Sequence, residues 1–85
     1  MNYDVIDVSA IEHLKLKVTF RDRTQGTVIF YETFLTGVFE PLKKPDFFSQ
    51  VNCHHGFVAW ADDIDLAPDA MYEAIKTNGK WILQE

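Results

Sequence analysis

The sequence LKLKVTF, residues 14–20, alternates apolar and polar side chains without a break. Side chains on a β-strand point alternately to opposite faces, so the apolar residues share one face and the lysines and threonine share the other. The pattern therefore predicts a strand whose apolar face is buried and whose lysines face solvent. It is the clearest structural signal in the chain.

The segments on either side of this strand also read as β-structure. Residues 5–10 predict a short strand before it, although their alternation is imperfect. Residues 21–26 are polar and end in glycine, which is typical of a hairpin connection. Residues 27–34 (TVIFYETF) predict a third strand that is apolar on both faces over its first half. Such a strand lies centrally, or is covered on its outer side.

The second half of the chain predicts helices as well as strands. Residues 38–40 are expected to form a helical turn or a tight loop, and Pro45 to open a short helix. Residues 51–60 predict a second hairpin with its glycine in the turn, followed by a polar loop at 62–65. Pro68 opens a final helix, and the glycine after Asn78 is a standard stop.

We therefore expect one α+β domain over residues 1–85, with a small antiparallel sheet and the element order β-β-β-α-β-β-α. The 85 residues include 47% hydrophobic and 25% charged residues, with a net charge of −5. The acidity argues against nucleic-acid binding by this chain alone, and no apolar run is long enough to cross a membrane. The N-terminus lacks the pattern of a signal peptide, and one cysteine forms no internal disulfide, so we expect a cytoplasmic location.

A set of residues in the second half resembles a known family. They are Gly37-Val38-Phe39-Glu40-Pro41-Leu42, Pro45, Phe47-Phe48, Val51, Gly56, Trp60, Asp65-Leu66-Ala67-Pro68-Asp69 and Tyr72. The set closely resembles the small bacterial proteins called domain of unknown function 2442 (DUF2442), and the resemblance extends over nearly the whole chain. Family members usually turn their first hairpin with Asp-Gly, whereas this chain has the longer segment 21–26.

The resemblance implies an α+β fold with a small antiparallel sheet and two helices, and it supplies no catalytic residue and no cofactor. Some members carry a helix-turn-helix DNA-binding domain after this one, whereas others stand alone. We expect this chain to be of the stand-alone type. Genes of such members often lie beside genes of small proteins suspected of being toxins, which implies a small protein partner.

The sequence Cys53-His54-His55 is the most tempting site for chemistry. Thiolate and imidazole are good ligands for zinc or copper, but neighbouring residues of a strand point to opposite faces, so at most two of the three could reach one ion. A cysteine nucleophile would also need an oriented base and an oxyanion pocket, which the sequence does not supply. Solvent-exposed histidines in a hairpin turn are the simpler interpretation.

Four aspartates lie within eight positions, at Asp62, Asp63, Asp65 and Asp69. They do not fit an EF-hand, because the glycine and glutamate that such a loop requires are missing. Asp69 is expected at the positive end of the last helix, and Asp65 at the end of a loop. Asp62 and Asp63 are left for solvent or for a partner.

Residues 81–83 are apolar and follow a helix stop, so they are expected either to fold back onto the sheet or to pack against a second copy, as in a homodimer. They and the N-terminal strand are candidate edges for adding a strand of another chain. We expect Trp60 in the core and leave Trp81 open.

These observations favour a non-enzymatic protein-interaction module that binds a small basic partner, as an antitoxin does. Residues 13–44 hold six Lys or Arg against three acids, whereas residues 62–85 hold six acids against two lysines. The expected contact residues are Asp62, Asp63, Trp81 and Ile82. The alternative is a small metal- or ligand-binding domain that uses Cys53-His54-His55.

Overall fold

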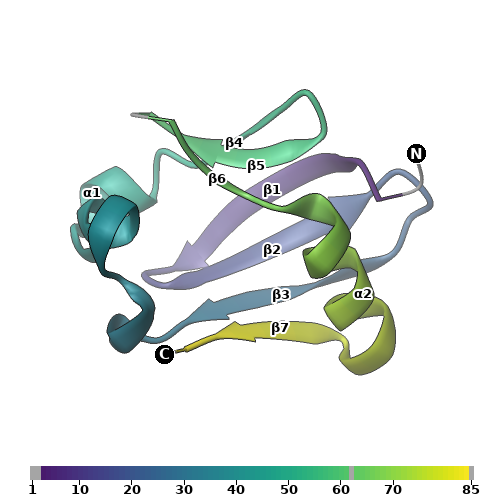
Figure 1. Cartoon of the computed structure of the whole chain (residues 1–85). Coiled ribbons are helices and arrows are strands. Elements are labelled where there is room, and N and C mark those ends of the chain that lie inside the picture. Colours follow the sequence, from purple (N-terminus) through teal and green to yellow (C-terminus); the bar gives the residue numbers. More distant parts are fainter. Residues whose placement is uncertain (1–2, 62, 85) are drawn as a thin grey trace.

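Among residues 3–61 and 63–84, which the computed structural model describes, the strands form two sheets (Figure 1). The first has four strands in the order β1-β2-β3-β7, and the second has three in the order β4-β5-β6. The strands are β1 (Val5–Glu12), β2 (Lys15–Phe20), β3 (Gln25–Phe30), β4 (Asn52–His54), β5 (Phe57–Trp60), β6 (Ile64–Leu66) and β7 (Lys80–Leu83). The helices are the 3₁₀ helices η1 (Glu32–Phe34) and η2 (Gly37–Lys43), and the α-helices α1 (Pro45–Phe48) and α2 (Pro68–Asn78). The predicted α+β class is confirmed.

The first sheet is built on the alternation of residues 14–20. Leu16, Val18 and Phe20 of β2 are fully buried, whereas Lys17 is exposed. Leu14 departs from the prediction, because it lies before the strand in a turn with φ +68°. In Figure 1, α2 lies over one end of this sheet, α1 and the 3₁₀ turns close the other end, and the second sheet runs along β1.

The connection between β2 and β3 is shorter than residues 21–26. The sequence predicts Gly26 in the turn, but it lies inside β3, opposite Val18 of β2. A Cβ at Gly26 would meet Cγ2 of Ile75 at 2.5 Å and the backbone oxygen of Gly79 at 2.7 Å. The glycine is therefore explained by the close approach of α2 to the sheet, and not by the hairpin turn.

The C-terminal residues 81–83 fold back onto the first sheet as β7. The sequence predicted an antiparallel sheet. The first sheet differs from this prediction, because β7 pairs with β3 in parallel. Gly79 makes this possible: it ends α2 in the left-handed conformation, with φ +79°, and its N–H donates to the Ile75 carbonyl. The chain thus leaves the helix directly into a strand that runs beside β3.

The second sheet contains the predicted hairpin and one strand more. β4 and β5 are joined by His55 and Gly56, both with positive φ, as in a two-residue hairpin turn. The prediction of a loop at 62–65 is wrong, because Ile64–Leu66 forms strand β6 and pairs with β5. Its burial alternates, with Ile64 and Leu66 inside and Asp65 exposed in mid-strand, so Asp65 does not end a loop.

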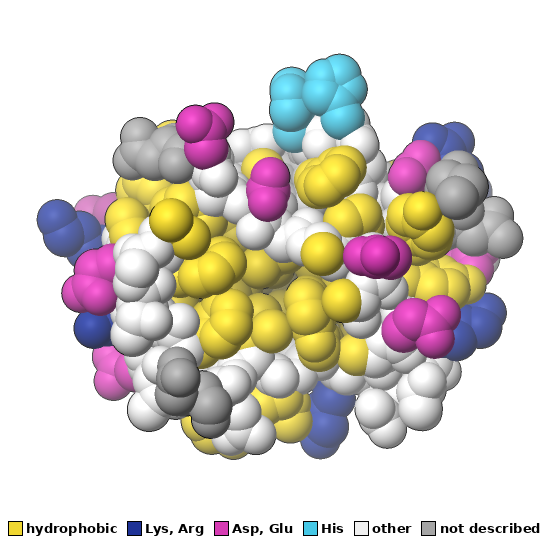
Figure 2. Space-filling view, viewed as in Figure 1, with side chains coloured by type: hydrophobic (Ala, Val, Ile, Leu, Met, Phe, Trp, Pro, Cys, Tyr) yellow, Lys and Arg dark blue, Asp and Glu magenta, His cyan; other side chains and the backbone are white. Residues whose placement is uncertain are grey.

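The two sheets and the helices enclose one core that includes Trp60. As expected, Trp60 is 4% exposed, and its Nε1–H donates to the carbonyl of Phe48 at 2.9 Å. The helix predicted from Pro68 to Asn78 is confirmed over that range. Figure 2 shows hydrophobic side chains gathered across the middle of one face, between the helices and below β6. None of the described helices is long and apolar enough to span a membrane.

Candidate functional site

Strand β7 lies at an edge of the first sheet, and one side of its backbone has no neighbouring strand among the described residues. The carbonyls of Gly79 and Leu83 accept from Thr27 and Tyr31 on the β3 side. In a parallel ladder alternate residues bond to the same neighbour, so Lys80 and Ile82 direct their N–H and C=O groups away from β3. We call these outward groups, together with the Trp81 side chain, the β7 edge.

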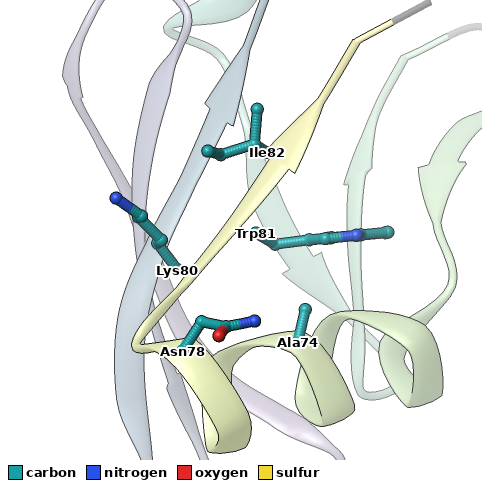
Figure 3. A pocket seen from close by; sticks show the side chains of 5 residues that line it. All are labelled: Ala74, Asn78, Lys80, Trp81 and Ile82. Carbon is teal, nitrogen blue, oxygen red and sulfur yellow. The ribbon is translucent and has the colours of Figure 1, made fainter.

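A surface hollow lies at the β7 edge. It has a volume of about 390 Å³ and is lined by Ala74, Asn78, Lys80, Trp81 and Ile82. Figure 3 shows the Trp81 side chain extending along α2 past Ala74, while Ile82 and Lys80 leave the strand on its other side. The hollow therefore combines an outward-facing strand backbone with a half-buried indole and a 38% exposed isoleucine.

The opposite edge of the same sheet, formed by β1, is less open. The N–H of Val5 donates to the carbonyl of Gly56 at 2.9 Å, which fastens β1 to the second sheet. The pairing of β1 with β2 also has two register shifts, one around Ile6 and one around Ile11. Bulges and covering segments are how proteins close an edge strand to further pairing. The two candidate edges predicted from the sequence are therefore unequal, and β7 is the more accessible one.

The predicted contact residues do not come together in one place. Trp81 and Ile82 lie in β7, whereas Asp63 is exposed in the turn between β5 and β6, with φ +61°. That turn belongs to the second sheet, and in Figure 1 it lies on the other side of the molecule from β7. Asp62 lies outside the described residues. The expected site is thus divided between two surfaces.

The side chain of Cys53 also lies apart from those of His54 and His55. Cys53 packs against the core, whereas His54 and His55 are exposed, with ring centroids 4.1 Å apart. Within residues 3–61 and 63–84, no group of three His, Cys, Asp or Glu side chains is placed to hold a metal ion. Burial, and secondarily the charge of Asp7, raises the pKa of the Cys53 thiol, which works against a reactive thiolate.

A polar cluster that the sequence did not predict joins the β2–β3 turn to α2. The hydroxyl of Tyr72 donates to the Asp22 carboxylate, and the N–H of Thr24 donates to the same carboxylate at 3.0 Å. Lys76 donates to the Tyr72 hydroxyl at 3.3 Å and lies 3.9 Å from Asp22. These contacts, with the Tyr72 bond the largest cause, lower the pKa of Asp22 to about 2.

This cluster has a structural role, because it holds α2 against the first hairpin. The edge-to-face contact of Phe20 with Tyr72, at 5.1 Å between ring centroids, supports the same docking. No local signal could reveal the pair, since Asp22 and Tyr72 lie fifty positions apart in the sequence.

Of the comparisons with known proteins, the one with family models agrees with the resemblance noted in the sequence. No curated protein matches the chain, and no solved structure does. A family model described as "Protein of unknown function (DUF2442)" matches residues 5–77 of the 85-residue chain. This range includes α2 up to its last turn and ends before β7. The chain therefore belongs to the DUF2442 family.

Proposed function

We propose that this protein is a non-enzymatic protein-interaction module that receives an extended segment of a partner protein on the β7 edge. The observation that carries the proposal is the open strand backbone of Lys80 and Ile82 beside the hollow at Trp81. Strand addition of this kind takes its affinity from backbone hydrogen bonds and its specificity from pockets for alternate side chains.

The energetics require both parts of the site. Lys80 and Ile82 present four outward backbone groups. A backbone hydrogen bond contributes about 1 kcal/mol net, so the four contribute about 4 kcal/mol. Association costs about 4–15 kcal/mol, so the backbone hydrogen bonds do not suffice alone and side-chain burial is needed as well. Burial of one large apolar side chain in the hollow adds about 1.5–3 kcal/mol.

The gene neighbourhood that the sequence resemblance implies, beside genes of suspected small toxins, supports a small protein as the partner, bound in the manner of an antitoxin. The acid-rich segment from residue 62 onward favours a basic partner, since complementary charge speeds association. In this proposal Asp63, exposed at its turn, adds a second contact away from the β7 edge. The metal-binding alternative has less support, because Cys53 and the two histidines do not converge.

The test compares two substitutions at one position. Ile82→Pro removes an N–H that points away from β3, so the fold is expected to remain, since proline is tolerated where an edge strand's N–H faces outward. Ile82→Ala shortens the side chain but keeps that N–H. With each protein immobilised and exposed to lysate of its source cell, wild type should recover one partner in equal amount to the bait. Ile82→Ala, which loses only side-chain contact, should recover that partner with a smaller loss than Ile82→Pro.

Ile82→Pro should lose that partner by about tenfold or more, while its thermal midpoint stays close to that of Ile82→Ala. A matched control is Ile11→Ala, which truncates an isoleucine on the opposite edge and should leave capture unchanged. Charge reversal by Asp63→Lys should weaken recovery of a basic partner. Equal recovery by wild type and Ile82→Pro would show that the β7 edge is not the binding site.

A further inference from the structure

The outer face of the first sheet carries a local charge opposite to that of the whole chain. The register places Lys17, Thr27 and Lys80 side by side in one row across β2, β3 and β7. The next row holds Lys15, Ile29 and Ile82. Neither β3 nor β7 contains an acidic residue, so the outer face is basic near the β7 edge although the chain's net charge is −5.

The acidic residues of this face lie at its far side. Asp7 and Glu12 belong to β1, and Glu12 is occupied by an ion pair with Lys15 at 3.5 Å. Strands are spaced by about 4.8 Å, so β1 lies about 14 Å from β7. Exposed charges are largely screened beyond about 8 Å at physiological ionic strength. The described part of the chain contains no ion-pair partner for Lys17 or Lys80.

From this arrangement we infer the chemistry of the segment that the β7 edge accepts, an inference that rests on the proposed function. The partner segment is an extended strand with an acidic side chain beside Lys80 and, two residues along, an apolar side chain beside Ile82. The residue between them points to the other face and places an apolar side chain in the hollow at Trp81. The segment is therefore acidic at this point even where the rest of the partner is basic.

Each of the three contacts follows from the strand geometry. An added strand lies one spacing from β7, and its side chains share rows with those of its neighbour. The row of Lys80 ends in an ammonium group without an ion-pair partner among the described residues, which favours a carboxylate beside it. The row of Ile82 ends in an apolar side chain that is 38% exposed, and an apolar neighbour covers it. On the inner face, Ala74 and Trp81 leave room for a larger apolar group.

A pair of palindromic peptides tests the inference without fixing the strand direction. The blocked peptide TVELVLEVT places Glu beside Lys80, Val beside Ile82 and Leu at the hollow in either direction, and TVKLVLKVT reverses its charge. Titration into ¹⁵N-labelled protein should shift the Lys80 and Ile82 amide resonances. Exposed charge pairs contribute about 0.2–1 kcal/mol, so changing attraction to repulsion predicts binding of the glutamate peptide about fivefold tighter.

Lys80→Glu should reverse the preference, whereas Lys17→Glu, two strands away on the same face, should leave it nearly unchanged. Equal binding of both peptides at β7 would overturn the acidic partner while leaving edge pairing intact. If neither peptide shifts these resonances, the inference is overturned as well. Whether the β7 edge binds a partner at all is decided separately, by the capture experiment with the Ile82 variants. Sedimentation could also show that the wild-type protein is a dimer and that Ile82→Pro abolishes it. That result would identify the occupant of the β7 edge as a second copy of this chain and would overturn the inference.

Discussion

Replacing Gly26 with alanine should destabilise the protein, because α2 approaches β3 where no Cβ fits. The added carbon would lie 2.5 Å from Cγ2 of Ile75 and 2.7 Å from the backbone oxygen of Gly79. Cγ2 of Ile75 belongs to a β-branched side chain and lies close to the backbone of α2. The Gly79 oxygen accepts the N–H of Thr27 at 3.3 Å. Neither can move without shifting the end of α2 and the start of β7.

The size of the effect follows from two opposing terms. A glycine-to-alanine change at a compatible backbone stabilises by about 0.4–1 kcal/mol through the unfolded state. Overpacking costs about 1–3 kcal/mol, and more where backbone has to shift. The net expectation is a loss of about 2 kcal/mol in the free energy of unfolding. In a domain of this size 1 kcal/mol corresponds to about 4–8 °C, so the thermal midpoint should fall by about 8–16 °C.

Calorimetry and urea unfolding measure the loss, and amide exchange of Trp81 and Leu83 reports whether β7 loosens. Gly37→Ala is the control, because a Cβ added at Gly37 would meet nothing within 4 Å, but the φ of this residue is +57°. It should cost about 1–2 kcal/mol through backbone strain alone and leave β7 exchange unchanged. A Gly26→Ala protein as stable as wild type would refute the account of how α2 packs on the sheet.

Two further predictions concern titratable groups. The pKa of Asp22 is lowered to about 2 from 3.8, so its stabilisation is present above pH 3.8 and fades as the pH falls towards 2. Tyr72→Phe should therefore lower the thermal midpoint at pH 7 and leave little difference near pH 2, and an equal difference at both would contradict the assignment. Because burial raises the pKa of the Cys53 thiol, alkylation by iodoacetamide at pH 7, followed by mass spectrometry, should be slower in the native protein than in urea. Equal rates would show that the fold does not protect the thiol.

Much of the fold could be predicted from local sequence patterns. Alternation in residues 14–20 predicted β2 and its buried face, although Leu14 lies before the strand. Pro68 with Asn78 and Gly79 predicted the bounds of α2. The second hairpin and the burial of Trp60 were also predictable. These features succeed because backbone preference and side-chain period are properties of neighbouring residues. The family could be recognised for the same reason, since its motifs lie in short stretches.

The candidate site was predictable only in part. Trp81 and Ile82 could be singled out because apolar residues after a helix stop need a partner surface. The sequence could not predict that β7 pairs with β3 in parallel and leaves one side of its backbone open. A strand of four residues has too short a pattern to indicate which strand it pairs with. The separation of Asp63 from β7 is likewise a property of the two-sheet arrangement.

The sequence by itself determined the fold class, strand β2, helix α2 and the family, because these depend on local periodicity and on short motifs. Only the tertiary structure decided that Gly26 lies in a strand beneath Ile75, that Asp22 meets Tyr72, and that Lys17 and Lys80 share a row at an open edge. These pairings join residues far apart in the chain. They are chosen by the packing of α2 and of the two sheets, which no single stretch of sequence contains.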